Sequence, residues 1–457
     1  MIFSDKNLSK REGKLLTDIQ TVTLIIFVIA IGLVVSRVIS SVVSAVIGVV
    51  ALVVSGAISD SAAFSLVDWN VIVILLSIWL IATYFGKTGV PEWLAEKMLE
   101  MSKGNLAFFV AAIGALAGIV SMFIDNVVII LMFAPVLLQV SRKFKFASFA
   151  PILFLGLCAN FMGTALLLGD LPPQLLHSVS GIEFLGFLWL EGKPSSFIIL
   201  TITYIVVIAV FYLVFKKFFK NRRVEIGREE GAENPIKNPK FAFLVCFMFL
   251  ATVLLMAFRQ FTGMHLGFLA FAGAVTLVLL VEILKGPWNI DVPGFEEILG
   301  EISWDAIFFY SSLFCLVGAL EHVGIIQIVA NWLAPFFKAS MLGGVSLLYW
   351  ITAPIVGVVE HDAFILAMLY IIRDFTHSTG ITAWPFYWAL LFAGTLGSNL
   401  TIAGAPALYV ALSMAEKEDG RKVPLGEFLR WSAPYVFLSL AVCFVILLII
   451  WVIPAMH

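Results

Sequence analysis

Residues 123–136 read FIDNVVIILMFAPV, an apolar stretch that is interrupted by the polar pair Asp125-Asn126. A charged side chain in hydrocarbon costs about 3 kcal/mol on insertion scales, so this pair must face protein or water. The surrounding stretch, residues 106–141, is long and otherwise apolar. We therefore predict a re-entrant hairpin whose tip brings Asp125 and Asn126 close to the middle of a membrane.

The second half of the chain repeats the first at a constant offset of 235 residues. One shift without gaps relates four landmark pairs: Trp69 and Trp304, Gly89 and Gly324, Asp125 and Glu360, and Gly169 and Gly404. A second hairpin is therefore expected in residues 341–372, with Glu360, His361 and Asp362 at its tip. A fold that is built twice, with a polar break at the same depth in each copy, is typical of secondary transporters.

The composition is that of a membrane protein. Hydrophobic residues make up 61% of the chain, charged residues make up 13%, and the mean hydropathy is +1.05. A soluble domain is about half apolar and about a quarter charged. The net charge of −2 says nothing about a polyanionic partner, but the lack of a basic run with interleaved aromatic residues argues against a nucleic-acid partner. The four cysteines lie in apolar segments without metal or disulfide spacing.

Apolar segments of bilayer length predict four membrane spans in each copy. They lie at roughly 18–37, 39–58, 69–87 and 194–215, and at roughly 241–258, 264–284, 304–321 and 431–453. The first is interpreted as a retained transmembrane helix rather than a cleaved signal peptide. The most charged stretch of the chain separates the copies. This gives a first transmembrane repeat at 1–215, a cytoplasmic linker at 216–240 and a second transmembrane repeat at 241–457.

Each copy also contains a second interrupted stretch. Residues 147–178 are broken at 160–164 and 169–173, and residues 383–413 are broken at 397–401 and 404–406. We expect unwound helices that cross the membrane once. Each copy then has about five crossings, an odd number, so the fold class is an all-α membrane protein with two inverted repeats. The positive-inside rule favours an external N-terminus in the cell (inner) membrane. Short amphipathic segments at Pro91–Lys103 and Ile326–Lys338 are expected on the membrane surface.

The polar breaks supply the candidate site. Their glycines permit unwinding and a close approach of the backbone to a ligand, and their amides and hydroxyls suit a small anion, an oxygen-rich solute or a sodium ion. The candidate substrate and ion ligands are Asp125, Asn126, Asn160, Gly163, Thr164, Gly169, Asp170, Ser398, Asn399, Thr401 and Gly404. The candidates for proton coupling are Asp125, Glu360, His361 and Asp362, because burial and proximity bring titratable groups toward neutral pKa values.

Structural roles remain open for the same residues. Asp125 also fits an N-cap of a hairpin arm. His361 also fits a residue that only hydrogen-bonds its hairpin, and the small residues of each break also fit ordinary helix packing. Asp170 has Ala405 as its repeat partner, which makes the two halves unequal.

At these motifs the chain resembles the ion transporter superfamily, in the branch of arsenite permeases, NhaD-type sodium–proton antiporters and the melanosomal P protein, which has a citrate-transporter-like domain. The resemblance spans nearly the whole chain. It is carried by FIDNVVIILMFAPV (123–136), NFMGTALLLGDLPP (160–173), EISWDAIFFYSSLFCLVGALEHVGII (301–326), GVVEHDAFILAM (357–368) and LFAGTLGSNLTIAGAPA (391–407).

The resemblance implies a scaffold part, a mobile transport part and assembly, in many members, as a homodimer. It implies a transporter of a small molecule or ion in the lipid bilayer, not an enzyme, with no cofactor apart from a coupling H⁺ or Na⁺. The leading expectation is ion-coupled movement of a small oxyanion or metalloid such as arsenite. The alternatives are a sodium–proton antiporter and a dicarboxylate or citrate symporter. The second hairpin departs from the family pattern, since it reads Glu360-His361-Asp362.

Overall fold

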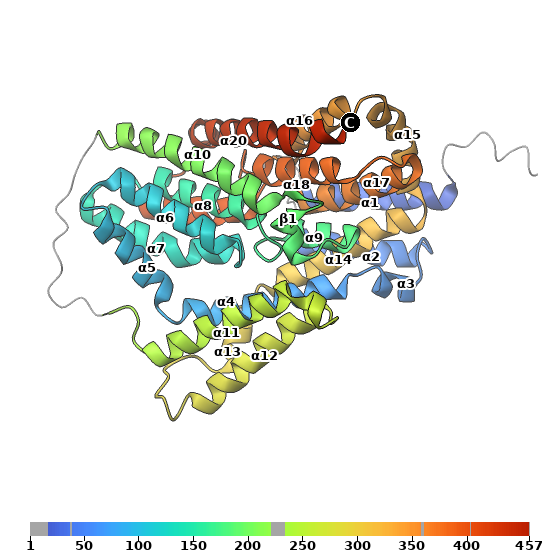
Figure 1. Cartoon of the computed structure of the whole chain (residues 1–457). Coiled ribbons are helices and arrows are strands. Elements are labelled where there is room, and N and C mark those ends of the chain that lie inside the picture. The colour runs from blue at the N-terminus through green and yellow to red at the C-terminus, as the bar shows by residue number, and fades with distance from the viewer. Residues whose placement is uncertain (1–16, 37–38, 221–233, 358–360, 403, 457) are drawn as a thin grey trace, which may run out of the picture. The chain divides into compact units, whose positions relative to one another are not determined.

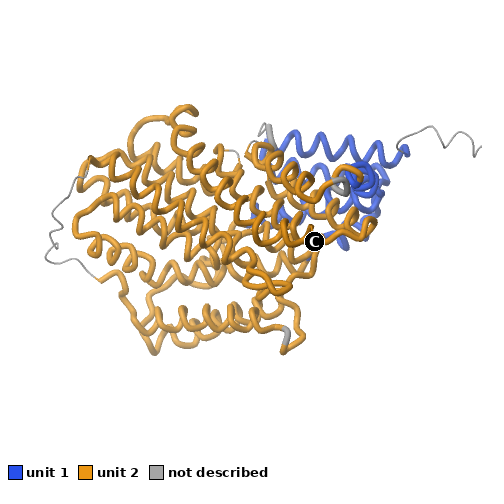
Figure 2. Tube along the Cα trace, turned by 45° about the horizontal axis from the view of Figure 1, so that its top comes forward, with its two compact units in different colours: residues 1–68, 304–334 blue, residues 69–303, 335–457 orange. Residues whose placement is uncertain are grey.

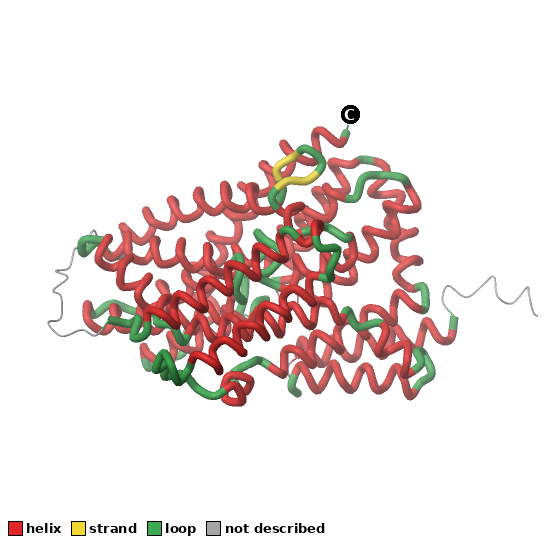
Figure 3. Tube along the Cα trace, turned by 60° about the horizontal axis from the view of Figure 1, so that its bottom comes forward, coloured by secondary structure: helices red, strands yellow, loops and turns green. Residues whose placement is uncertain are grey.

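The protein is almost entirely helical. The computed structural model describes residues 17–36, 39–220, 234–357, 361–402 and 404–456. Figure 3 shows helices joined by short loops, with one small strand pair. Seven of the described helices are long and apolar enough to cross a bilayer. They are α4 (Trp69–Gly86), α7 (Asn126–Phe144), α10 (Ser196–Phe218), α11 (Pro239–Ala257), α12 (Leu266–Leu284), α14 (Trp304–His322) and the run that begins with α20 (Leu425–Leu447) and continues to Ala455.

The chain divides into two units, which are coloured separately in Figure 2. The first contains residues 1–68 and 304–334, and its helices are α1 (Asp18–Ser36), α2 (Ser41–Val54), α3 (Asp60–Ser65) and α14. α2 packs between α1 and α14 through a small-residue core that includes Ala30, Ala45 and Ala319. Within this unit the Gln20 side-chain amide donates to the Val323 carbonyl at 2.8 Å.

The second unit contains residues 69–303 and 335–457. Its remaining helices are α5 (Val90–Met101), α6 (Leu106–Ser121), α8 (Phe149–Gly163), α9 (Leu171–Ser180), α13 (Phe295–Gly300), α16 (Met341–Val356), α17 (His361–Thr379), α18 (Trp384–Ser398) and α19 (Pro406–Asp419). α15 (Ile325–Ala339) crosses the boundary between the units. Short elements are η1 (Phe184–Phe187), η2 (Arg259–Phe261), η3 (Leu448–Val452), η4 (Ile453–Ala455) and the antiparallel strands β1 (Trp189–Leu190) and β2 (Lys193–Pro194).

The repeat appears directly in the helix bounds. α16, α17 and α18 each begin and end 235 residues after α6, α7 and α8. The first predicted hairpin is present as a helix pair, since α6 and α7 are joined by residues 122–125 and pack on each other. The tip of the second, at 358–360, lies outside the described residues, and α16 and α17 flank it. The predicted bilayer-length spans agree with the observed helices to within a few residues, apart from the longer α20.

One detail of the predicted breaks is wrong. Asn160–Gly163 and Gly397–Ser398 lie in the last turns of α8 and α18, so the chain leaves the helix only at Thr164 and at Asn399. The helical hydrogen bonds of these turns are kept because α8 and α18 are buried on every side, where unpaired backbone groups are costly. The unwound segments are therefore 164–170 and, among the described residues, 399–402 with 404–405.

α8 and α18 are the buried centre of the second unit. Every residue of α8 is buried, as is every residue of α18 after Trp384. A helix that is apolar all round lies in a protein core or spans a membrane. Here protein surrounds both helices: α6, α7 and α19 pack on α8, and α16, α17 and α20 pack on α18. Figure 1 shows α10 and α20 running side by side over this centre, and α11 and α12 forming a helix pair beside α4.

The helices that follow the breaks exchange partners between the copies. α9, from the first half, packs on α17 of the second half, and α19 packs on α7 and α8 of the first. Asp419, the last residue of α19, joins α19 to the start of α8. Its carboxylate accepts hydrogen bonds from the Ser148 N–H (3.1 Å), the Ser148 hydroxyl (2.9 Å) and the Phe149 N–H (3.3 Å). α8 is thus capped by a residue from the other half, and the neighbouring Glu418 pairs with Arg142 at the end of α7.

We predict that Asp419→Ala lowers the stability of the protein by about 1 kcal/mol, because N–H groups at the start of α8 lose their acceptor. Thermal unfolding of the detergent-solubilised protein measures the change as a lower melting temperature. Lys417→Ala is the matched control, since Lys417 is an exposed residue of the same helix. Equal melting temperatures for the two variants would contradict the capping role.

Candidate functional site

The tip of the first hairpin is held by Asp125. Its Oδ1 accepts hydrogen bonds from the N–H groups of Val127 (2.9 Å) and Val128 (3.4 Å) at the start of α7. These are two of the N–H groups that a helix start leaves without internal partners. Asp125 is therefore the N-cap of α7, which is the structural role considered for it above. Its Oδ2 is not needed for that role.

The first unwound segment lies against this hairpin tip. A Cβ atom built on Gly169 would lie 2.1 Å from the Ser121 carbonyl oxygen and 2.6 Å from the Gly163 carbonyl oxygen. Only glycine allows this approach of backbone to backbone. Asp170 then starts α9, and its Oδ1 accepts from the Leu171 N–H at 2.9 Å. Two prolines follow in the first turn, where a missing N–H is harmless.

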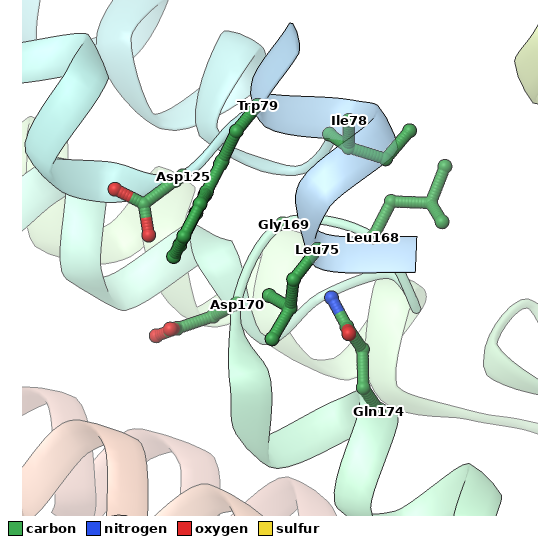
Figure 4. A pocket seen from close by; sticks show the side chains of 8 residues that line it. All are labelled: Leu75, Ile78, Trp79, Asp125, Leu168, Gly169, Asp170 and Gln174. Atoms are coloured by element: carbon green, nitrogen blue, oxygen red, sulfur yellow. The ribbon is translucent and has the colours of Figure 1, made fainter. Parts of the chain in front are cut away.

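A small cavity lies where the tip, the unwound segment and α4 meet (Figure 4). Its volume of about 10 Å³ has room for about one water molecule. The lining residues are Leu75, Ile78, Trp79, Asp125, Leu168, Gly169, Asp170 and Gln174. Figure 4 shows the Trp79 ring edge-on beside Asp125, with Asp170 and Gln174 below it. The carboxylates of Asp125 and Asp170 both lie on the left of this view, and Gln174 lies on the right.

Gln174 adds a third oxygen to the carboxylates of this cavity. The residue is 1% exposed, and its Oε1 has no hydrogen-bond partner among the described residues. Buried polar atoms without partners are rare in native proteins because each costs free energy. The Oγ of Ser121, at the end of α6, is also buried and unpartnered within the described part of the chain. The surroundings of the cavity therefore hold unused oxygen atoms.

Buried amides connect this cavity to the second half of the chain. Asn126 Nδ2 donates to Asp170 Oδ2 at 3.2 Å and to Asn160 Oδ1 at 2.9 Å. Asn160 Nδ2 in turn donates to Ser398 Oγ and to Asn399 Oδ1, both at 3.0 Å, and lies 3.4 Å from the Thr395 carbonyl oxygen. All of these side chains are at most 8% exposed. The network joins the tip of the first hairpin to α8, to α18 and to both breaks.

The contacts between α8 and α18 are related by the repeat. Adding 235 turns Asn160 into Thr395 and Thr164 into Asn399. The pair Asn160–Asn399 is therefore mirrored by the pair Thr164–Thr395, whose hydroxyls lie 2.6 Å apart. This is the pattern of an isologous interface, in which i touches j and j touches i, here formed within one chain.

The second half repeats the close packing of break against hairpin. A Cβ on Gly404 would lie 2.2 Å from the Ser398 carbonyl oxygen. The Thr401 hydroxyl donates to the carbonyl of Gly357, at the end of the second hairpin's first arm, at 2.5 Å. Asn399 Nδ2, in a side chain that is 0% exposed, has no hydrogen-bond partner among the described residues.

The titratable groups of the second hairpin lie at the start of α17. His361 Nε2 is 3.2 Å from Asp362 Oδ1, and both side chains are 4% exposed. α17, which these two residues begin, packs on α9, whose N-cap is Asp170, so the three side chains lie at the starts of two contacting helices. Glu360, the predicted counterpart of Asp125, lies outside the described residues. No group of three or more metal-ligating side chains is found in the part of the chain that the structure describes.

The structure thus brings most of the predicted residues together. Asn126, Asn160, Asp170, Ser398 and Asn399 form one network, and Asp125 and Gly169 line the cavity beside it. Gly163 ends α8, directly before Thr164, and its Cβ position would lie 3.1 Å from Asp170 Cβ.

Sequence reasoning missed Trp79, Gln174 and Thr395. The repeat could have identified Thr395, since it is the counterpart of Asn160 at the offset of 235 residues. Gln174 and Trp79 had no such signal, because a polar or aromatic residue inside an apolar helix does not reveal which way it faces.

Comparison with known proteins places the chain among transporters. A family model described as "Citrate transporter" matches residues 25–393. An uncharacterized transporter of Mycobacterium tuberculosis is 24% identical over 387 residues, which cover 82% of this chain and 84% of the relative. The P protein of Homo sapiens is 22% identical over 451 residues, covering 82% of this chain and 53% of the P protein.

Two solved structures share the fold. The YdaH transporter of Alcanivorax borkumensis, described as having an unusual topology, matches with a TM-score of 0.57 and 12% identity, covering 94% of this chain and 98% of that one. MtrF of Neisseria gonorrhoeae, from a class of antimetabolite efflux pumps, matches with a TM-score of 0.57 and 13% identity, covering 98% and 97%. At this identity the likeness concerns the fold alone.

We predict that Gly169→Ala destabilises the protein by about 1–3 kcal/mol, because the new methyl group meets backbone atoms that cannot move singly. Gly426→Ala, at the start of α20, is the control, since a Cβ there meets nothing within 4 Å. Size-exclusion profiles and melting temperatures in detergent distinguish the two. If both variants are equally stable, the tight contact between break and hairpin is wrong.

Proposed function

This chain belongs to the citrate transporter family, and we propose that it moves a small oxygen-rich anion across the membrane, coupled to Na⁺ or H⁺. It is a multi-pass membrane protein and a secondary transporter, not an enzyme. The observation that carries the proposal is the cavity lined by Asp125 and Asp170, which the amide network joins to Asn399.

The two copies, residues 1–215 and 241–457 with the 216–240 linker, are proposed to be inverted repeats. Each hairpin would enter and leave on one side, while each broken helix would cross once. α8 has 15 residues and α9 has 10, so neither alone reaches the roughly 20 residues that a span needs. The crossed pairs of α8 and α18 support this reading, because a two-fold axis in the membrane plane relates inverted copies.

The first half-site is proposed to bind the coupling cation. Asp125, Asp170 and Gln174 all line a space the size of one water. Carboxylates inside a membrane are costly and mark ion or proton pathways. A sodium ion or a proton would neutralise one of the two carboxylates, which relieves their mutual repulsion. Glu360, His361 and Asp362 are proposed to carry protons in the same cycle, since α17, which begins with His361 and Asp362, packs on α9, which follows Asp170.

The second half-site is proposed to bind the anion. Asn399 Nδ2 has free donor capacity within the described residues. Ser398 precedes it in the last turn of α18, Thr401 follows it in the break, and Gly404 keeps the backbone close to the end of α18. α19 begins one residue after Ala405, and the N–H groups of a helix start favour negative charge. Thr164 is the corresponding hydroxyl of the first break.

Three substrate classes follow from this arrangement. The family model favours a citrate-like or dicarboxylate anion. A small oxyanion or metalloid such as arsenite needs the same donors in a smaller space, and it is the leading expectation from the sequence motifs. In the runner-up, a sodium–proton antiporter, Asp125, Asp170 and Glu360 would bind Na⁺ and protons in competition. The two carboxylates in one cavity are the observation that favours this runner-up.

We predict that Asp170→Asn lowers ion-driven accumulation about tenfold or more, as expected when roughly 1.4 kcal/mol or more of cation binding is lost. Proteoliposomes with imposed Na⁺ or pH gradients would be assayed with labelled citrate, succinate and arsenite, and for Na⁺ release driven by a pH gradient alone. Asp291→Asn, an exposed carboxylate of the same unit, is the control.

The arms of this assay distinguish the classes. Anion uptake that depends on a cation gradient supports the proposal, and Na⁺–H⁺ exchange without any anion supports the runner-up. Full gradient-driven accumulation by the Asp170→Asn protein would contradict the cation site in both.

A further inference from the structure

Three buried asparagines form one chain of hydrogen bonds whose orientation is fixed at both ends. At one end the Asp170 carboxylate can only accept from Asn126 when it is ionised, so the atom facing it is Nδ2. At the other end the Thr395 carbonyl oxygen accepts from Asn160, which fixes the nitrogen of Asn160 as well. The amide of Asn399 must then turn its oxygen toward Asn160.

The nitrogen and the oxygen of the Asn160 side chain both form hydrogen bonds within the protein. Its nitrogen serves Ser398 and Asn399, and its oxygen accepts from Asn126. Because both its nitrogen and its oxygen are engaged, Asn160 has no donor to offer a ligand. Asn399 differs, because only its oxygen is engaged and its nitrogen remains available. The orientation of Asn160 therefore decides that Asn399 presents an N–H donor rather than a carbonyl oxygen.

We infer that Asn160 is a positioning residue that aims the Asn399 amide at an anion and transmits the occupancy of Asp170 to it. This inference rests on the proposed function for its ligands, and it gives a physical reason for coupling between them. It also changes the role expected for Asn160. This residue orients the side chain of Asn399 and does not itself contact the substrate or the ion.

The chain of amides has two arrangements. While Asp170 is ionised and empty, it holds Asn126 by a charge-assisted hydrogen bond, which is stronger than a neutral one. A cation or proton on Asp170 removes that advantage and frees Asn126 to turn. The oxygen of Asn160 then loses its fixed donor. The hydrogen bonds from Asn160 Nδ2 to Ser398 and Asn399 change as a result. Coupling needs such a two-state element that both ligands bias.

The repeat supplies an internal control. Thr164 and Thr395 pair at the symmetry-related position of the same α8–α18 contact, at 2.6 Å. Within the described part of the chain, the side chain of Asn126 donates to Asn160 and Asp170 and not to these hydroxyls. Removing the Thr395 hydroxyl therefore perturbs the helix contact without cutting the amide chain. Thr395→Val keeps the side-chain shape and the carbonyl group that Asn160 contacts.

The experiment measures whether Asp170 communicates with the second break, and it needs no substrate. Asp170→Asn mimics the neutral state of the cation site. Hydrogen–deuterium exchange with mass spectrometry would compare uptake by peptides covering residues 396–406, with and without Asp170→Asn, in the wild-type, Asn160→Leu and Thr395→Val backgrounds. We expect Asp170→Asn to raise the exchange rate there at least about twofold in the wild-type and Thr395→Val proteins, and to leave it unchanged in Asn160→Leu.

Asn126→Leu cuts the same chain on the other side of Asn160, and it serves as the second variant in case Asn160→Leu does not fold. The inference is overturned if Asp170→Asn leaves exchange unchanged in the wild-type protein, or changes it equally when either asparagine is replaced. A loss of the response in Thr395→Val as well would also overturn it, because the effect would then come from helix contact alone. These results do not bear on whether vesicles accumulate an anion, so failure of the relay and failure of the proposed function remain distinguishable.

Discussion

The fold depends on the rule that a polar group buried inside a membrane protein must find its partner within that protein. α8 and α18 are buried throughout, and each ends in polar residues that no lipid or neighbouring apolar helix can satisfy. The pairs Asn160–Asn399 and Thr164–Thr395 satisfy them by crossing from one copy to the other. The exchange of α9 and α19 between the halves serves the same contact, as do Gly169, which lies against the first hairpin, and Gly404, which lies against the end of α18.

The two copies have the same helix arrangement but carry different polar side chains at equivalent positions. Asp170 has Ala405 as its counterpart, and the buried Gln174 has Tyr409, which is 55% exposed. The first half therefore gathers acceptor oxygens, whereas the second leaves a donor free on Asn399. In the proposed cycle this difference assigns the cation to one half and the anion to the other. The shared helix contact is what would let each respond to the other.

The sequence predicted the hairpins and the repeat well, because a polar pair inside an apolar stretch and a constant offset are both strong local signals. It predicted the breaks less well, since tertiary burial keeps Asn160 and Gly163 helical where their composition favours unwinding. The partner exchange of α9 and α19 was not predictable, because hydropathy gives segment lengths and not neighbours. For the same reason Gln174 was missed: its apolar helix does not reveal which residue faces the cavity.

The central claim is that the two broken helices meet through symmetry-related residues, and cysteine cross-linking tests it most directly. Thr164→Cys and Thr395→Cys would be combined in a protein whose four native cysteines are replaced, and the single variants would serve as controls. The hydroxyls of these threonines lie 2.6 Å apart, which places the new thiols within reach of a disulfide. The account predicts an intramolecular disulfide on mild oxidation, seen by mass spectrometry, in the double variant alone. Free thiols in a folded, monodisperse and oxidised double variant would contradict it.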